Sequence, residues 1–309
     1  MIAARGAEWV GAESPRLRYP GGRSRDDSAP PPDAPYAALE RMNRFQEPEA
    51  RRIIRDLALP ARSRGLDVGC GIGLWALWLA EAVGRGGHVL GIEPEIEKVE
   101  AARERARGAA RVQFERGEAT AIPLADRSVD WVWYGDVLHH VVDTQAALRE
   151  CLRVLHPGGR VIVKESQVPA AMFLPGHPEL ERRIQVAEIR RTLGEGAGRS
   201  FQERRQTTPA ALRAAGLEPR MRTYVLERRA PLSAAAHDYI QHTVFSRNWG
   251  DRLRELLDAE DWRARMRVCD EASAENVLRS PDYYCLYPIT VFSARVPGAP
   301  RRSRRRRRA

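Results

Sequence analysis

The stretch Leu66-Asp67-Val68-Gly69-Cys70-Gly71-Ile72-Gly73 decides the fold of this 309-residue chain. Its apolar beginning ends abruptly in three glycines at alternate positions, and an apolar segment of helical character begins at Leu74. The order strand, glycine turn, helix is typical of a ligand-binding unit in an open α/β sheet. Because glycine carries no side chain, one side of the turn is bare, and a flat ligand can approach the backbone there.

Strand and helix patterns alternate on both sides of this turn. Short apolar stretches predict strands, and apolar residues at three- and four-residue spacing predict the helices between them. Such an alternation indicates a mainly parallel sheet covered on both faces, which is a doubly wound α/β domain. The predicted strands are residues 65–68, 88–92, 111–116, 129–134, 159–164, 221–226 and 284–296, and the clearest predicted helices are residues 36–57, 74–79, 96–107, 144–155 and 208–215.

Changes in composition divide the chain into one domain with two tails. Residues 1–35 mix Gly, Pro, Ser and Arg without periodicity, and residues 298–309 contain an arginine run, so both are expected to be disordered. The α/β domain is expected to span residues 36–297. The alternation of strands and helices is interrupted at about residues 165–207 and 230–280, where helical insertions are expected to form a lid over the carboxyl ends of the strands.

The composition indicates in which compartment the protein is found and whether it binds a metal. With 43% apolar residues the chain can bury a sizeable core, but it has no apolar run near the roughly 20 residues that cross a bilayer and no secretory signal pattern. Its four cysteines show no CxxC or other metal-ligand spacing, which indicates reduced thiols and predicts no metal site. We therefore expect a cytoplasmic protein without a membrane span.

The formal net charge of +10 is unevenly distributed along the chain. Seven arginines lie within residues 301–308, which leaves only +3 for residues 1–300. Nucleic-acid binding needs cations clustered on a folded face. The charge pattern therefore argues against a nucleic-acid partner, and the arginine run is expected to be a solvated end.

Two ligands fit a bare glycine turn, a dinucleotide and S-adenosylmethionine. The dinucleotide fingerprint GxGxxG would need a glycine where this chain has Leu74, whereas Gly73 completes GxGxG. A pyrophosphate also disfavours a nearby carboxylate, while Asp67 suits the ammonium and sulfonium of S-adenosylmethionine. Glu93, just after the second predicted strand, can accept hydrogen bonds from ribose hydroxyls, a feature that nicotinamide sites share.

Five sequence blocks follow one another along the chain: Leu66–Gly73, Gly91–Glu93, Gly117–Ala119 with Ile122–Leu124, Leu138–Val141 and Leu155–Gly159. In this order and spacing they resemble class I S-adenosylmethionine-dependent methyltransferases, most closely the ubiquinone/menaquinone-type and small-molecule subgroup. The resemblance covers about residues 60–165 strongly and residues 205–296 loosely. It implies a Rossmann-like sheet of seven strands in which the last strand is antiparallel.

The resemblance also implies the residues of the donor site. At one position the chain departs from the family, which commonly has aspartate where this chain has Glu118; the longer acid can still accept a hydrogen bond from the adenine amino group. The implied residues are Asp67, Gly69, Gly71 and Gly73 for the methionine part and its turn, Glu93 for the ribose, Glu118 and Ala119 for the adenine edge, and Gly135 or Asp136 over the donor.

The resemblance further implies methyl transfer to a small organic acceptor, in specialised or quinone-like metabolism. Because the sulfonium is an activated leaving group, a base is needed only if the acceptor atom is a hydroxyl or an acidic carbon. His139 and His140 lie where such a base is expected, with structural positioning as the alternative role. The candidate pocket residues in and after the insertions, which packing of the lid would equally require, are His177, Tyr239, His242 and Tyr283.

Two other functions remain compatible with the sequence. A protein that binds S-adenosylmethionine without transferring its methyl group would serve as a regulator or assembly partner. A nicotinamide oxidoreductase would share the carboxylate at Glu93. The sequence leaves oxygen, nitrogen and carbon open as the methylated atom, and it leaves the oligomeric state open.

Overall fold

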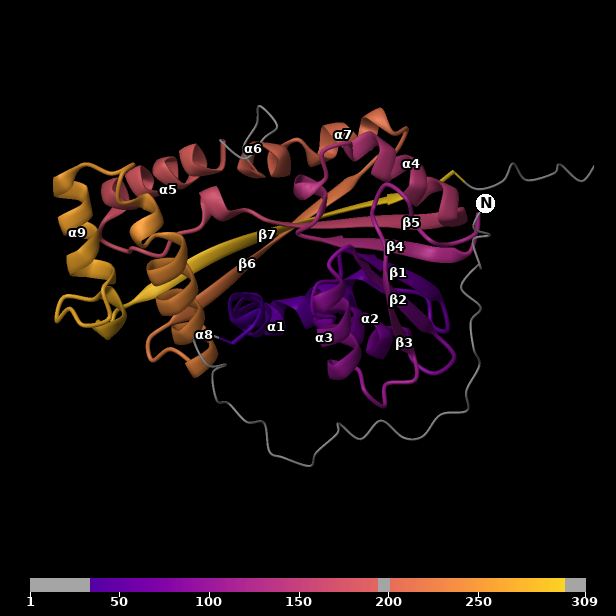
Figure 1. Cartoon of the computed structure of the whole chain (residues 1–309), viewed down its shortest axis with the longest axis horizontal. Helices are drawn as coiled ribbons and strands as arrows, with labels where there is room; N and C mark the ends of the chain where they lie inside the picture. The colour runs from indigo at the N-terminus through magenta and orange to yellow at the C-terminus, as the bar shows by residue number, and fades with distance from the viewer. Residues whose placement is uncertain (1–33, 194–200, 298–309) are drawn as a thin grey trace, which may run out of the picture.

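The computed structural model describes residues 34–193 and 201–297, so the tails predicted at residues 1–35 and 298–309 fall almost wholly outside the described residues. Within these ranges, seven strands form one sheet of order β3-β2-β1-β4-β5-β7-β6 (Figure 1). The strands are β1 (Arg64–Val68), β2 (His88–Glu93), β3 (Val112–Arg116), β4 (Val129–Gly135), β5 (Leu155–Ser166), β6 (Arg220–Arg229) and β7 (Tyr284–Arg295).

The strand directions show at which edge of the sheet a ligand would bind. β1 pairs in parallel with β2 and β4, whereas β7 runs antiparallel to both β5 and β6, which confirms the predicted seven-stranded fold with an antiparallel last strand. Val68 at the end of β1 pairs with Tyr134 of β4, so the carboxyl ends of these strands are adjacent. Strand order reverses here, and ligands of open α/β sheets bind at such a switch point.

Helices cover both faces of the sheet. They are α1 (Ala37–Leu57), α2 (Leu74–Val83), α3 (Ile96–Arg105), α4 (Thr144–Val154), α5 (Pro178–Leu193), α6 (Phe201–Gln206), α7 (Thr208–Ala214), α8 (Ala234–Asp238) and α9 (Ala259–Cys269), with a π-helix over Tyr239–Asn248. Residues of β4 alternate between two cores: Trp131 and Trp133 pack with α1, α2 and α3, and Val132 and Tyr134 pack with α4 and α7. In the described part of the chain, every helix is too short or too polar to span a membrane.

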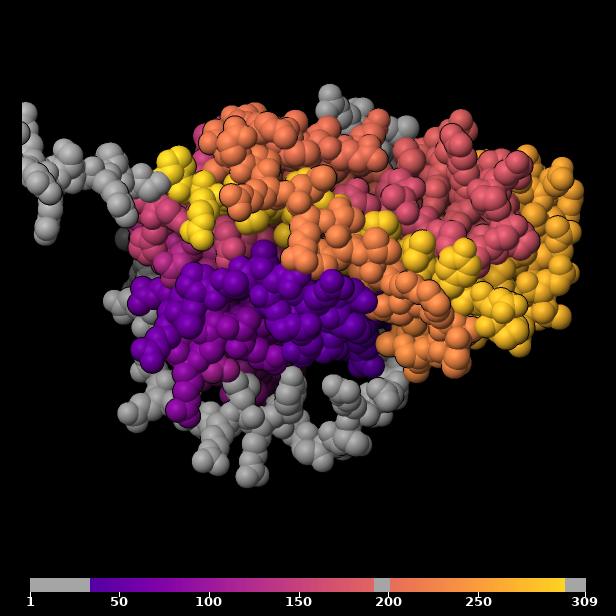
Figure 2. All heavy atoms as spheres, turned by 180° about the vertical axis from the view of Figure 1, so that it is seen from behind, coloured from indigo at the N-terminus to yellow at the C-terminus, as the bar shows by residue number. Residues whose placement is uncertain are grey.

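The predicted insertions fold mainly as helices beyond the carboxyl end of β5. β6 and β7 continue past β5, and α5, α8 and α9 gather around their far end (Figure 1). α1 joins this region to the sheet, because its Arg41 forms a buried ion pair with Asp238 at 3.0 Å and its Glu49 pairs with Arg228 of β6 at 2.6 Å. Figure 2 shows from behind that α1, in indigo, lies against the orange segment of β6 and α8.

Candidate active site

The glycine turn between β1 and α2 has the backbone that its sequence predicts. Gly69, Gly71 and Gly73 have positive φ angles of +67°, +54° and +82°. A Cβ atom at Gly69 would lie 2.5 Å from Val137, and one at Gly73 would lie 2.6 Å from Phe114. Glycine is therefore needed at both positions for close packing as well as for conformation.

Two buried carboxylates face this turn. Asp67 is the last residue but one of β1, at 2% exposure, and Glu93 is the last residue of β2, at 5% exposure. The backbone N–H of Gly71 donates a hydrogen bond to Glu93 Oε2 at 3.0 Å. Among the described residues, the buried Oδ2 atom of Asp67 has no hydrogen-bond partner. The structure thus brings together the residues predicted to hold the methionine part and the ribose.

The electrostatics of this corner favour a cation. Burial, together with the negative charge of Glu93, raises the pKa of the Asp67 carboxyl well above its usual range. Lys98 contributes one positive charge, with its Nζ atom 3.8 Å from Glu93 Oε1 and hydrogen-bonded to Glu95. An ammonium group beside Asp67 would supply the missing hydrogen-bond donor and stabilise the ionised carboxylate.

The predicted adenine-binding segment follows β3 and lies beside Glu93. The N–H of Gly117 donates to the carbonyl of Glu93 at 3.2 Å, which holds the two segments together. Of the next two residues, Glu118 is exposed and Ala119 is half-buried. Their side chains are therefore open to a ligand at the edge of the turn, and adenine binding by them stays a prediction.

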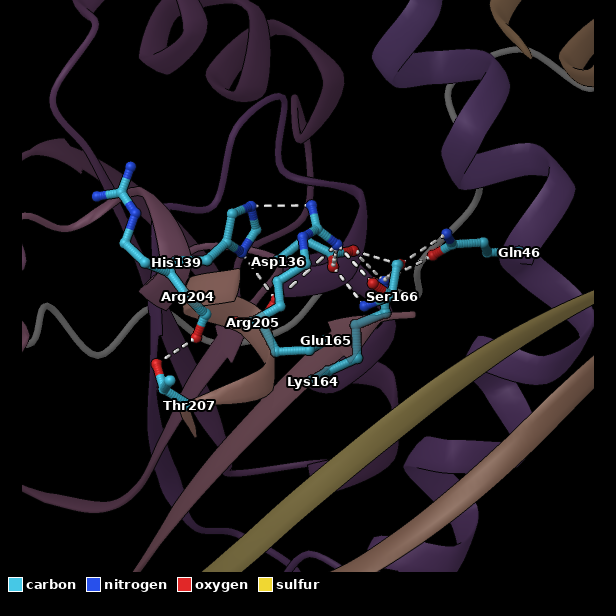
Figure 3. Close-up of polar contacts among 9 residues, drawn as sticks. All are labelled: Gln46, Asp136, His139, Lys164, Glu165, Ser166, Arg204, Arg205 and Thr207. Carbon is cyan, nitrogen blue, oxygen red and sulfur yellow. Dashed lines mark hydrogen bonds and ion pairs between the residues drawn. The ribbon is translucent and has the colours of Figure 1, made fainter. Parts of the chain in front are cut away.

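A second cluster of polar side chains lies at the carboxyl ends of β4 and β5 (Figure 3). Asp136, directly after Gly135, accepts hydrogen bonds from Lys164, from the N–H and hydroxyl of Ser166, and from Arg205 of α6. Burial alone would raise the pKa of Asp136, but the two cations outweigh it and hold the pKa well below its usual range. These hydrogen bonds hold the Asp136 carboxylate within the polar cluster, and its closure over the donor stays a prediction.

His139 is the buried centre of this polar cluster. Its Nδ1 atom lies 2.8 Å from Glu165 Oε2, and its Nε2 atom lies 2.9 Å from Arg205 Nη2. Since arginine only donates, Nε2 accepts, and Nδ1 must carry the proton that it shares with Glu165. Burial and the charge of Arg205 lower the pKa of His139 to about 2, so the ring is neutral.

Glu165 and His140 complete the surroundings of His139. Burial and the negative charge of Asp136 raise the pKa of Glu165 to about 8. The exposed His140 packs its ring on His139, with centroids 4.1 Å apart, and on Phe201 of α6, with centroids 4.6 Å apart. His140 thus flanks the cluster, whereas His139 is bonded within it.

The four candidate pocket residues do not form one pocket. His177 and Tyr283 line a cavity of about 450 Å³ at the far end of the lid. Ser166 at the end of β5 pairs with Ile289 of β7, and Tyr283 lies six residues before Ile289. At about 3.3 Å per residue, the cavity is therefore roughly 20 Å from the end of β5. Tyr239 is buried and stacks on Phe45 at 4.4 Å, and His242 lies 3.8 Å from Asp238.

The residues of the polar cluster that were not predicted from the sequence include Lys164, Glu165, Ser166 and Arg205. A signal existed for the first three, because a run of polar residues closes an otherwise apolar strand at the ligand-binding edge of the sheet. Arg205 had no such signal, since nothing in the insertion distinguishes it from the neighbouring arginines.

A family model described as a methyltransferase domain matches residues 66–163. The chain contains a methyltransferase domain. The predicted resemblance to class I methyltransferases is thereby confirmed for this part of the chain. The methyltransferase domain holds the glycine turn, Glu93 and His139, whereas Glu165 and Arg205 lie beyond the matched residues.

The methyltransferase domain is similar to the demethylmenaquinone methyltransferase of Staphylococcus aureus strain JH9. The two are 34% identical over 136 residues, which cover 43% of this chain and 56% of that protein. The chain therefore spans about half the length of the curated relatives it matches.

Two solved structures share the fold over most of the chain. One is BH2331 of Bacillus halodurans C-125, described as a candidate methyltransferase, with a TM-score of 0.50, 16% identity, and coverage of 80% of this chain and 98% of that chain. The other belongs to a complex of the Haloferax volcanii Trm112 methyltransferase activator with a candidate methyltransferase, with a TM-score of 0.50, 18% identity, and coverage of 86% and 95%. At these identities they show the fold alone.

Proposed function

We propose that this protein transfers a methyl group from S-adenosylmethionine to a small organic acceptor. The observation that carries the proposal is the pair of buried carboxylates, Asp67 and Glu93, beside the bare glycine turn of a methyltransferase domain. Asp67, with its unpartnered Oδ2 atom, would bind the ammonium of the donor. Glu93 would bind the ribose hydroxyls, and Glu118 with Ala119 the adenine edge.

The transfer would be an in-line displacement at the methyl carbon. Bound S-adenosylmethionine supplies a methyl group on a good leaving group, so the chain has to align the acceptor and exclude water. α1 serves the second task, because Leu39 lies over the turn: a Cβ atom at Gly71 would be 3.1 Å from its side chain. Gly135 and Asp136 would border the transferred methyl from the end of β4.

The pair His139 and Glu165 would handle the proton of an acidic acceptor. His139 Nε2 would take the proton, while Glu165 accepts the hydrogen bond from Nδ1 and stabilises the cation that forms. For this step, Arg205 must release its hydrogen bond to Nε2 and move its charge away, because burial and that charge lower the pKa of His139 to about 2 and make it a weak base. The similarity to a demethylmenaquinone methyltransferase supports a quinol-like acceptor, which carries such a proton.

Calorimetry and a labelling assay test the proposal together. The full chain is titrated with S-adenosylmethionine and with S-adenosylhomocysteine, and is then incubated with methyl-labelled donor and fractions of a cell extract. Binding followed by label in a small molecule is the expected result. Binding without transfer to any fraction would favour the donor-binding regulator, and absence of binding would overturn the assignment.

The base is tested in a separate comparison. His139→Gln is expected to lower the transfer rate about 100-fold or more for a hydroxyl acceptor, with donor affinity unchanged. His140→Gln is the matched control, because this exposed neighbour has no hydrogen bond to Glu165 in the described structure. Equal rates for the two variants would remove His139 from the mechanism.

A further inference from the structure

β6 is an edge strand of the sheet and has β7 as its neighbour on one side (Figure 1). All ten residues of β6 pair with β7 without a shift in register. In the described part of the chain, no strand pairs with the other side of β6, which is called its free side below. Backbone N–H and C=O groups on such a side can bind a further strand, and natural proteins usually protect long edges from this pairing.

The hydrogen-bond pattern shows which backbone groups face the free side. The N–H of Ala230, directly after β6, donates to the carbonyl of Tyr283 at 2.9 Å. Because hydrogen-bonded pairs alternate along antiparallel strands, the even-numbered residues of β6 bond to β7 and the odd-numbered residues face away from it. Met221, Thr223 and Val225 therefore direct their N–H and C=O groups to the free side.

The side chains of these three residues are exposed. Met221 is 68% exposed and Val225 is 52% exposed, and Thr223 between them is exposed as well. Residues two positions apart lie on the same face of a strand, so the three side chains form one row. The row is mainly apolar and borders directly on the outward-facing backbone groups.

The opposite edge of the sheet is better protected. β3 has five residues, half as many as β6. Arg103 of α3 donates a hydrogen bond from Nε to the carbonyl of Phe114 in β3 at 2.9 Å. Short length and a charged side chain on the backbone are two ways in which edge strands are blocked. β6 is long, and proline is absent from it.

The charges of β6 permit pairing with a like strand. Three of its four arginines form ion pairs within the chain: Arg222 with Asp56, Arg228 with Glu49 and Arg229 with Glu227. The fourth, Arg220, lies at the start of the strand. A second β6 strand would therefore meet few unneutralised charges of its own sign near Thr223.

We propose that two copies of this chain pair antiparallel along β6, with a two-fold axis at Thr223. Met221 and Val225 are equidistant from Thr223, so the axis places Met221 of each copy opposite Val225 of the other and buries both. This symmetry of the row identifies a second copy as the occupant. In this register Arg220 lies opposite Leu226, and at about 3.3 Å per residue the two Arg220 residues are roughly 20 Å apart along the strands. The inference is independent of the proposed function.

Disulfide cross-linking of the full chain tests the axis. The Cα atoms of a hydrogen-bonded antiparallel pair are about 5.5 Å apart, which lies in the range that a disulfide bridges. The natural cysteines are all buried. Under mild oxidation, Thr223→Cys is therefore expected to form a covalent dimer. Val225→Cys is the matched control, because its two copies would be about 13 Å apart along the strands and should form little dimer.

Sedimentation over a range of protein concentrations tests the facing side chains. The wild type is expected to show a concentration-dependent dimer. Met221→Glu and Val225→Lys should each weaken it roughly tenfold or more, because each places a charge opposite an apolar side chain. The double variant should regain part of the affinity, since the new charges attract each other across the axis. Within one copy they are four residues apart and cannot meet.

The remaining outcomes overturn the inference. Circular dichroism and S-adenosylhomocysteine affinity, expected to be unchanged, show that each variant is folded. A wild type that stays monomeric would exclude a second copy as the occupant, even if another protein bound along β6. A dimer that neither single substitution weakens would lie elsewhere on the surface. Equal cross-linking of Thr223→Cys and Val225→Cys, or a double variant weaker than both single variants, would contradict the axis at Thr223.

Discussion

Glu93, at the end of β2, accepts a hydrogen bond from the backbone N–H of Gly71 at 3.0 Å, although the two residues are 22 positions apart. This bond fixes the carboxylate at the opening of the glycine turn. Because the carbonyl of Glu93 also binds the N–H of Gly117, one residue orders three neighbouring segments of the site. The donor site is thus organised by the ends of adjacent parallel strands.

Removal of this carboxylate should selectively weaken donor binding. Glu93→Ala is expected to reduce the affinity for S-adenosylhomocysteine about 10- to 100-fold, because hydrogen bonds to a charged group contribute about 1.5–3 kcal/mol. Calorimetry on the full chain measures the effect. Glu95→Ala is the control, since Glu95 is 57% exposed and lies two residues away. Similar affinities for the two variants would contradict the assignment of Glu93.

The close packing of Gly73 should make its replacement destabilising. A Cβ atom there would lie 2.6 Å from Phe114 and 3.0 Å from Ala102, at a φ angle of +82°. Gly73→Ala is expected to lower the free energy of unfolding by roughly 2–4 kcal/mol. Gly216→Ala has a similar φ angle, +79°, but open space around it, and should cost about 1 kcal/mol. Urea denaturation compares them, and equal losses would refute the packing argument.

The raised pKa of Glu165 predicts how stability depends on pH. Its folded-state pKa of about 8 lies above the usual 4.5, so between these values the folded protein holds a proton that the unfolded chain has released. The free energy of unfolding therefore falls as pH rises through this window. Glu165→Gln should remove roughly 2–4 kcal/mol of that fall. Denaturation at several pH values measures this fall in the free energy of unfolding, and Glu179→Gln is the control because the Glu179 side chain is 90% exposed. The same pH dependence of unfolding in the wild type and in Glu165→Gln would contradict the raised pKa of Glu165.

The buried ion pair between Arg41 and Asp238 should be important for attaching α1 to the lid. Asp238→Asn is expected to lower the free energy of unfolding by about 3–5 kcal/mol, because it removes the negative charge that faces a buried cation. Glu47→Gln, in an exposed pair with Arg51 on the same helix, should cost at most about 1 kcal/mol. Chemical denaturation of both variants tests the difference, and a small loss for Asp238→Asn would show that other contacts hold α1.

Much of the fold was predictable because the sequence patterns that specify it involve residues close together in the chain. The glycines at positions 69, 71 and 73 need positive φ angles, and all three have them. The apolar strands and the helices between them were found close to their predicted places, and the structure extends β5 to Leu155 and β6 to Arg229. The extension of β5 was missed because Pro157, Gly158 and Gly159 are typical of a turn, and that of β6 because its last residues, Glu227 to Arg229, are charged.

The amino-acid sequence by itself determined the strand–turn–helix unit with Asp67, the place of Glu93 at the end of the next strand and the alternation that builds a doubly wound sheet, because each of these patterns is local. Only the tertiary structure decided that Glu165 and Arg205 bind opposite sides of His139, from 26 and 66 residues away. It also separated His177 and Tyr283 from that centre. Such contacts arise when distant elements pack together, and no local periodicity records which side chains meet there.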